Sequence, residues 1–136
     1  MAEKITLWCI HRLELEDVEV LTIEIVIKKM NEDSGYCEPA GENKYKLTIA
    51  NNQGLRDFIM TVAHEMVHIK QWAKNEMYEY TTPGKVRFMK TKYDMNDLNY
   101  WDYPWEIEAF GKQQGLFVRF CEDTGIAARD DMKEEC

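Results

Sequence analysis

Two of the three histidines in this chain lie four residues apart, in the pentapeptide His64-Glu65-Met66-Val67-His68. If this segment is helical, the two imidazoles share one face, one turn apart, and can bind the same Zn²⁺ ion. Glu65 follows the first histidine, and its carboxylate can take a proton from a zinc-activated water and later give it to a leaving amine. The H-E-x-x-H pattern therefore predicts a zinc site with its own general base. The alternative is a buried helix whose histidines only satisfy hydrogen bonds.

The residues around this motif favour a helix. No proline or glycine occurs from Leu55 to about Asn75. Apolar residues recur there at spacings of three and four, which gives one apolar face; they are Leu55, Phe58, Ile59, Val62, Met66, Ile69 and Ala73. Gly54 marks the turn into the helix, and we expect Asn51 or Asn52 to cap it.

A catalytic zinc site usually has three protein ligands and one open position. No histidine follows His68, and His11 lies far upstream, where we expect an ordinary surface or core residue. The third ligand must then be Asp, Glu or Cys. The best candidates are Glu106 and Glu108, in a helix expected to begin at Pro104 and to run to Gly111 or on to Phe120. Residues two apart on a helix point about 200° apart, so only one of them can face the metal.

The segment 61–71 resembles the active-site helix of small zinc metallopeptidases, and residues 104–109 (Pro-Trp-Glu-Ile-Glu-Ala) resemble the Glu-x-x-Ala element of gluzincins. Overall, the chain looks like the short single-domain proteins described as SprT-like or minigluzincin-like. This resemblance implies that Glu106 is the third zinc ligand and that Ala109 lets the two helices pack closely. True SprT proteases use a third histidine, which is absent here. The gluzincin comparison is therefore the better one, and a role in repairing DNA–protein crosslinks is not implied.

The function that this resemblance implies is peptide-bond hydrolysis, with zinc held by His64, His68 and Glu106 and with Glu65 as general base. A further donor must stabilise the oxyanion. Tyr103 is the first choice because it precedes the ligand helix; Tyr100, Tyr80 and Tyr78 are the others. The resemblance also implies that the strand before the active-site helix binds extended substrate by β-addition. That strand would be Lys44–Ala50, with Tyr45, Leu47 and Ile49 as its substrate-binding residues.

Two alternatives from other functional classes remain. One is a zinc-containing binding or regulatory module of the same fold without turnover. The other is a helical interaction protein in which the motif is fortuitous. Bound zinc would distinguish the peptidase and the zinc-containing module from the helical interaction protein. The intact Glu65 distinguishes the peptidase from the module without turnover only weakly.

Composition limits the partners. The chain has 136 residues, enough for one compact domain, with 45% hydrophobic and 31% charged residues, as in soluble proteins. A net charge of −8 argues against a nucleic-acid partner and leaves a peptide or protein substrate. No apolar run is long enough to span a membrane, and the first residues do not begin a signal peptide. The four cysteines could form two bridges, but they show no C-x-x-C pair, and the missing export signal predicts free thiols in the cytoplasm.

The expected fold is α+β, a single zincin-like domain over residues 1–136 in which a short sheet packs on the active-site helix and a second helix carries a ligand. We expect strands at 5–11 and 45–50. Residues 17–30 fit a strand or a helix, and the resemblance favours a helix. Residues 34–43 read as a loop or hairpin connection. The basic run Lys85, Arg87, Lys90 and Lys92 predicts a solvated strand or hairpin face, and residues 130–136 a mobile tail.

Overall fold

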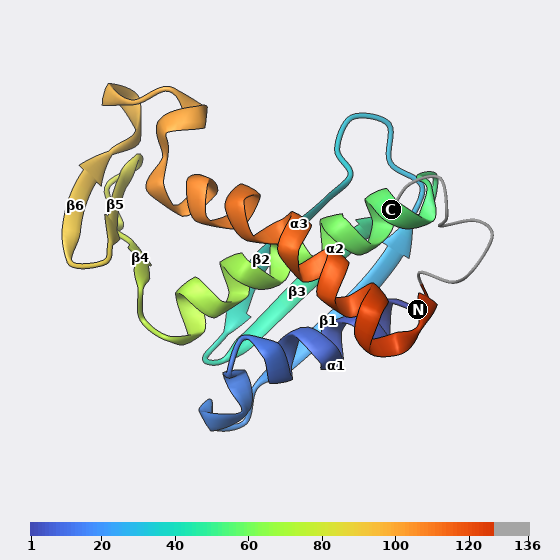
Figure 1. The fold of residues 1–136 in the computed structure, drawn as a ribbon. Helices are drawn as coiled ribbons and strands as arrows, with labels where there is room; N and C mark the ends of the chain where they lie inside the picture. Colours follow the sequence, from blue (N-terminus) through green and yellow to red (C-terminus); the bar gives the residue numbers. More distant parts are fainter. Residues whose placement is uncertain (127–136) are drawn as a thin grey trace.

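The computed structural model describes residues 1–126, which form an α+β fold with three α-helices and two three-stranded sheets (Figure 1). The predicted tail, 130–136, lies outside these residues. The elements are α1 (Ala2–Arg12), β1 (Thr22–Lys28), β2 (Gly35–Gly41), β3 (Lys44–Ala50), α2 (Leu55–Ala73), β4 (Met77–Glu79), β5 (Lys85–Phe88), β6 (Thr91–Asp94) and α3 (Pro104–Thr124), with 3-10 turns η1 (Leu15–Asp17), η2 (Met95–Asp97) and η3 (Tyr100–Asp102).

The first sheet has the order β1-β3-β2. Its central strand, β3, pairs with β1 in parallel and with β2 antiparallel. Tyr45, Leu47 and Ile49 alternate along β3 and are buried in the main hydrophobic core. The prediction of a strand at 45–50 is confirmed, because alternation of apolar residues is what a strand with one face on the core requires.

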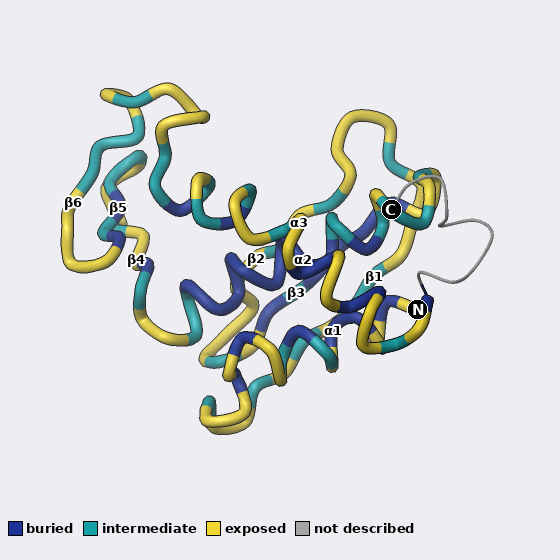
Figure 2. Tube along the Cα trace, in the orientation of Figure 1, coloured by how far each residue is buried: buried dark blue, intermediate teal, exposed yellow. Residues whose placement is uncertain are grey.

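The helix that carries the motif, α2, packs on β2 and β3 and also on α1 and α3. Every residue from Val62 to Gln71 is buried, so this part of the helix is covered by its neighbours, whereas its first turn is partly exposed (Figure 2). The predicted helix is confirmed, but the predicted cap is not. The N-cap is Gly54, without a side-chain hydrogen bond, and Asn52 instead binds the backbone of Met30, just after the neighbouring strand β1.

The second helix that was predicted to carry a ligand, α3, begins at Pro104 as predicted, where the fixed φ of proline suits the first helical turn. It runs the full 21 residues to Thr124 and ends on Gly125, whose φ of 73° is the left-handed conformation typical of a helix C-terminus. The two glycines within α3, Gly111 and Gly115, do not interrupt it.

Two predictions at the N-terminus are wrong. Residues 5–11 lie in α1 rather than in a strand, because the buried residues Ala2, Ile5 and Cys9 recur at helical spacing. Residues 22–28 form β1 rather than a helix. Residues 35–41, predicted as a loop or hairpin connection, also form an edge strand, β2, which tolerates Pro39 because one side of an edge strand needs no ladder bonds.

The segment between α2 and α3 forms the second sheet, in the order β4-β5-β6. Its apolar side packs around Trp105 in a separate small cluster. The predicted basic hairpin is confirmed as β5–β6. Arg87 lies 5.5 Å from the ring centre of Tyr78, and Lys92 lies 5.1 Å from that of Tyr80. Within residues 1–126, no helix combines the length and apolar character needed to cross a membrane.

Gly35, at the start of β2, lies where the strand comes closest to α2. A Cβ there would be 2.8 Å from both the Thr48 carbonyl oxygen and the Thr61 methyl group. Gly35→Ala should therefore lower the free energy of unfolding by about 1–3 kcal/mol, as overpacking does. Chemical denaturation measures this change. The control is Gly111→Ala on an exposed part of α3, where nothing lies within 4 Å of the new methyl group. This control should stabilise by about 0.5–1 kcal/mol, and equal stability of the two variants would contradict the close approach.

Candidate metal centre

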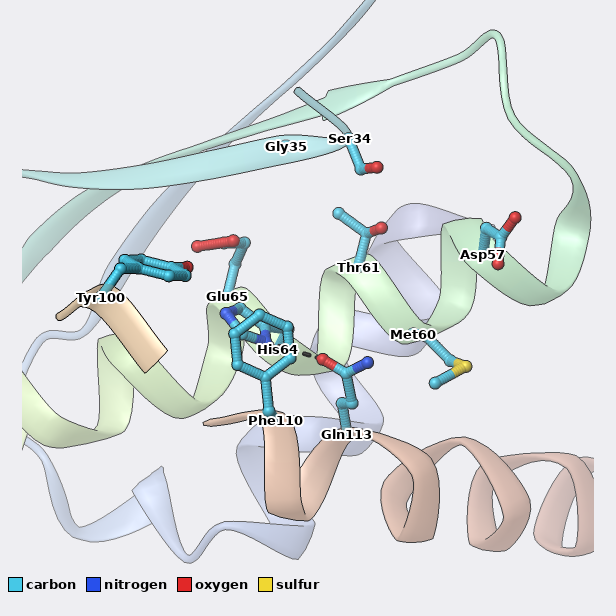
Figure 3. Close-up of a pocket in the computed structure, with 10 residues that line it drawn as sticks. All are labelled: Ser34, Gly35, Asp57, Met60, Thr61, His64, Glu65, Tyr100, Phe110 and Gln113. Atoms are coloured by element: carbon cyan, nitrogen blue, oxygen red, sulfur yellow. Dashed lines mark hydrogen bonds between the residues drawn. The ribbon is translucent and has the colours of Figure 1, made fainter. Parts of the chain in front are cut away.

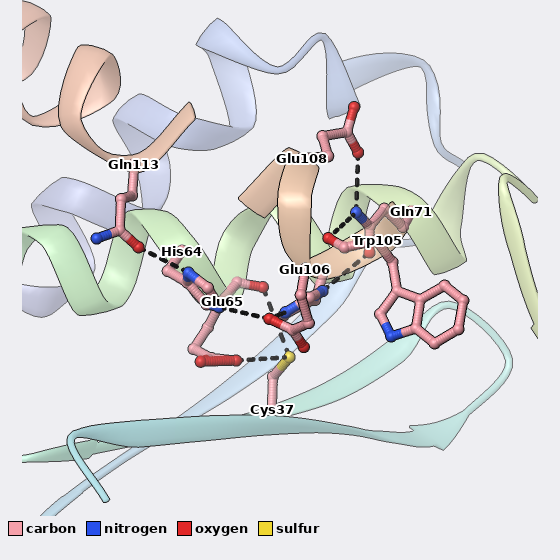
Figure 4. A network of polar contacts seen from close by, with 9 residues as sticks. Cys37, His64, Glu65, Gln71, Trp105, Glu106, Glu108 and Gln113 are labelled. Carbon is pink, nitrogen blue, oxygen red and sulfur yellow. Dashed lines mark hydrogen bonds and ion pairs between the residues drawn. The ribbon is translucent and has the colours of Figure 1, made fainter. Parts of the chain in front are cut away.

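His64, His68 and Glu106 converge on one point between α2 and α3. The Nε2 atoms of His64 and His68 lie 3.1 and 3.2 Å from the same oxygen, Glu106 Oε1. Figure 4 shows His64 and Glu106 pointing toward one another. One ligand atom from each residue lies within 4.8 Å of the others. Two buried histidines one turn apart on α2, and a carboxylate from the first turn of α3, thus form a three-ligand group that neither helix could provide alone.

The outer nitrogens of both rings are held by glutamine side chains. His64 Nδ1 lies 2.7 Å from Gln113 Oε1, and His68 Nδ1 lies 2.9 Å from Gln71 Oε1. The orientation of the Gln71 amide is fixed, because its Nε2 donates to two acceptors, the Trp105 carbonyl and Glu108. His68 must therefore donate from Nδ1, which leaves the lone pair on Nε2 facing Glu106 when the ring is neutral.

This donor set fits a small divalent cation. Neutral imidazoles and a carboxylate that point lone pairs at one another repel unless protons or a cation lie between them. Ligands at zinc–nitrogen and zinc–oxygen distances lie ~3.3 Å apart around a tetrahedral ion. The two observed separations, 3.1 and 3.2 Å, are close to that value. Burial raises the pKa of Glu106, but its contacts with His64 and His68 outweigh burial and lower the pKa to about 2.

Glu108 points elsewhere. Its carboxylate accepts hydrogen bonds from Lys70 Nζ at 2.8 Å and from Gln71 Nε2 at 2.8 Å. Burial raises the pKa of Glu108, and these two hydrogen bonds more than reverse that effect and lower it. Of the two candidate glutamates, the structure brings Glu106 to the histidines and places Glu108 in an ion pair with Lys70, as the angular argument requires.

Glu65 lies at the mouth of the site, and Cys37 on β2 faces it. The Cys37 thiol is 3.5 Å from both the Glu65 carboxylate oxygen Oε1 and the Glu65 carbonyl oxygen. Burial raises the pKa of Glu65, and the charges of His68 and His64 oppose this only in part. The pKa of Cys37 is also raised well above its usual value, first by burial and then by the charge of Glu65. The thiol is therefore protonated and donates. Nothing in the sequence pattern had indicated that Cys37 lies here.

The tyrosine at the site is Tyr100 rather than Tyr103, our first choice. Tyr103 donates its hydroxyl to the Met95 carbonyl at 3.2 Å and stacks on Trp105, with ring centres 4.9 Å apart. Tyr100, in η3, lines the cavities on both sides of Glu65. Burial, followed by the nearby Glu106 carboxylate, raises the pKa of Tyr100 to about 12. The hydroxyl is therefore protonated at neutral pH. Tyr78 lies on β4 and Tyr80 directly follows that strand, and neither of them lines the two cavities.

The predicted substrate strand cannot accept a peptide. Both edges of β3 are already paired, and the side chains of Tyr45, Leu47 and Ile49 are buried in the core. The prediction assigned the role to the strand that directly precedes α2 in the sequence. The sheet has two edge strands, β1 and β2, and β2 is the one beside the candidate site. Tyr36 and Cys37 of β2 line the cleft beside the histidines.

Two adjoining cavities open beside the candidate metal centre and share Gly35, His64, Glu65 and Tyr100. One, of about 310 Å³, runs along α2 to Asp57 and is here called the Asp57 cavity (Figure 3). The other, of about 340 Å³, runs past Glu106 to Trp72 and Glu79 and is here called the Glu79 cavity. The remaining histidine, His11, is on the surface with its Nδ1 3.0 Å from Glu16 Oε1, as predicted for an ordinary surface residue.

No protein-family model, curated protein sequence or solved structure matches this chain.

Proposed function

We propose that this protein is a zinc metallopeptidase with a small zincin-like fold of the gluzincin type. One observation carries this proposal. His64 and His68 on α2 and Glu106 on α3 direct their ligand atoms to one point, with the buried carboxylate of Glu65 beside it. The site lies at the wall shared by two open cavities, where an extended chain has room to pass.

Each residue has a role that follows from its surroundings. A Zn²⁺ ion held by His64, His68 and Glu106 would supply a Lewis acid that polarises a carbonyl and makes water acidic. Glu65 has a raised pKa and lies next to this point, so it is suited to take a proton from the attacking water and return it to the leaving amine. Tyr100 keeps its proton and can donate a hydrogen bond to the developing oxyanion.

The edge of β2 supplies a way to hold the substrate backbone. An extended peptide can pair with the edge strand of a sheet, and β2 is the edge strand next to Glu65. Gly35 and Tyr36 line the cleft there. A peptide paired with β2 would run along both cavities and past the three ligands, which is the arrangement that hydrolysis of an internal peptide bond needs.

The test is removal and return of the metal. Protein purified with zinc should cleave an unstructured protein such as denatured casein. Chelation should stop this activity, because polarisation of the carbonyl and activation of water both need the ion. Adding about one equivalent of zinc per chain should restore it. If the protein binds one zinc but cleaves no unstructured substrate, it is the zinc-containing module without turnover. If it binds no zinc, the H-E-x-x-H motif is fortuitous.

Tyr100→Phe should lower kcat for peptide hydrolysis by about tenfold and leave zinc content unchanged. This is less than the roughly 10²–10³-fold loss expected for a buried oxyanion donor, because Tyr100 is 46% exposed and water can replace its hydroxyl in part. The matched control is Tyr103→Phe, which removes a hydroxyl bound to the Met95 carbonyl, because Tyr103 itself lines neither cavity. If Tyr103→Phe has the larger effect on kcat, the assignment of Tyr100 is wrong.

A further inference from the structure

The Asp57 cavity and the Glu79 cavity, here together called the cleft, are lined by acidic side chains. Among residues 1–126, no lysine or arginine lines either of the two cavities, whereas Asp57 lines one and Asp33 and Glu79 line the other. None of these three carboxylates has an ion-pair partner among the described residues. A divalent cation at the metal centre would offset Glu65 and Glu106, so the negative charge of the other three would remain.

The Asp57 cavity combines this charge with apolar surface. Its lining includes Met60 of α2 and Phe110 of α3 together with several uncharged polar side chains. Asp57 lies at the end opposite Tyr100, with Met60 between it and His64 on the helix (Figure 3). Asp57 precedes His64 by seven residues, which places it ~10 Å along the helix axis. This is about the length of three extended residues.

A cavity with an apolar wall and a carboxylate at its far end suits one kind of side chain. Lysine and arginine have long aliphatic stems that pack on apolar surface while the charged end seeks an anion or water. A neutral apolar side chain would fill the walls but leave the Asp57 carboxylate with water alone, and an acidic side chain would be repelled. Asp57 also lies in the first turn of α2, where negative charge is favourable. This favourable effect explains why an acidic residue occurs at position 57. It does not explain why Asp57 lines a cavity, or why no lysine or arginine lines that cavity among the described residues.

We infer that the cleft selects cationic peptide segments and that Asp57 binds a lysine or arginine within about three residues of the scissile bond. This inference rests on the proposed peptidase function and adds a substrate class to it. Asp33 and Glu79 on the other side of the centre extend the preference to basic residues across the bond. Carboxylates without partners along a cleft also attract a cationic chain over a distance, and this effect weakens as salt is added.

The experiment begins with zinc-loaded protein and denatured casein, whose cleavage sites are identified by mass spectrometry. Matched peptides are then made around the most frequent site, one with lysine and one with norleucine at the same position. Norleucine keeps the four-carbon stem and loses the charge. The lysine peptide should have a kcat/KM about fivefold higher, the scale of a partly exposed ion pair. Asp57→Asn should remove that difference, while Asp17→Asn, an exposed acid that lines neither cavity, should not.

The outcomes separate this inference from the proposed function. Equal cleavage of the two peptides, or a preference that survives in Asp57→Asn, would overturn the inference and leave the peptidase intact. If nothing is cleaved, the peptidase proposal fails, and fluorescence anisotropy with a labelled Ala-Gly peptide carrying three lysines or three norleucines decides the inference. Tighter binding of the lysine peptide that is lost in Asp57→Asn would support a cation-selective cleft, and equal affinities would reject it.

Discussion

Replacing Glu65 with glutamine is expected to lower hydrolysis of denatured casein by at least ~10²-fold, the usual scale for loss of a general base. Glutamine has nearly the same shape and can still contact the Cys37 thiol, which lies 3.5 Å from Glu65 Oε1. It cannot accept a proton at neutral pH. The fold and the three metal ligands should therefore remain, and the change should be confined to kcat. Single-turnover cleavage with zinc-loaded protein measures the rate of hydrolysis, and metal analysis measures the zinc content.

Retained zinc with lost activity is the informative combination. A variant that loses zinc as well would show that Glu65 supports the site structurally, and the loss of activity would then say nothing about proton transfer. A variant as active as the wild type would remove Glu65 from the mechanism. If both proteins are inert on diverse substrates, the zinc-containing module without turnover becomes the better hypothesis.

The second large effect concerns the metal. The double variant His64→Ala/His68→Ala should bind no zinc in competition with a chromophoric chelator, because only one of the three ligands remains. Glu106→Ala should lower zinc affinity more than ~100-fold, since loss of even an outer partner of a ligand costs 10–100-fold. Glu108→Ala is the matched control. It removes a carboxylate two residues away on the same helix, which contacts Lys70 and Gln71 rather than the histidines. Gln71 keeps its hydrogen bond to the Trp105 carbonyl, so this variant should retain most of the affinity.

Comparing the Glu106 and Glu108 variants distinguishes direct ligation from a general electrostatic effect, because both glutamates are partly buried, carry the same charge and lie on α3. A general electrostatic effect of negative charge near the histidines would weaken zinc binding in both variants alike. Only direct ligation makes the Glu106 variant far worse than the Glu108 variant. Full zinc occupancy in the double histidine variant would mean that the ion binds elsewhere on the protein.

Helices α2 and α3 could be predicted from the sequence because the patterns that indicate them are local. An uninterrupted helical period over α2 and a proline at the start of α3 each act within a few residues, and both helices lie where they were predicted. Helix geometry required that only one of Glu106 and Glu108 face the histidines, and the resemblance to gluzincins selected Glu106. Gln71 could have been noticed three residues after His68, and Gln113 two turns after Glu106, as candidates to hold the histidine rings.

The remainder depended on contacts between distant segments. The residues of α1 include many β formers, and only their burial against α2 and α3 shows which spacing counts. For β1, the resemblance outweighed the alternating isoleucines, which were the better guide. β2 contains Gly35, Pro39 and Gly41, a composition typical of loops, and it is a strand because β3 offers it an edge. Cys37 reaches the site through β2, so no local pattern could have indicated it. Tyr100 was one of four candidate tyrosines, and only the placement of η3 beside the site distinguishes it from the other three.

Gln71, described above as the partner of His68, also affects which ions the site would accept. Its side chain is fully buried, and its oxygen and both amide hydrogens are engaged, by His68, by the Trp105 carbonyl and by Glu108. The imidazole cannot turn without breaking contacts between the two helices that carry the ligands. The conformational entropy of arranging this ligand is therefore lost when the chain folds and not when an ion arrives. A rigid set of nitrogen and oxygen donors this close together favours a small ion such as Zn²⁺ over a larger one such as Ca²⁺, which needs six to eight oxygens at longer distances.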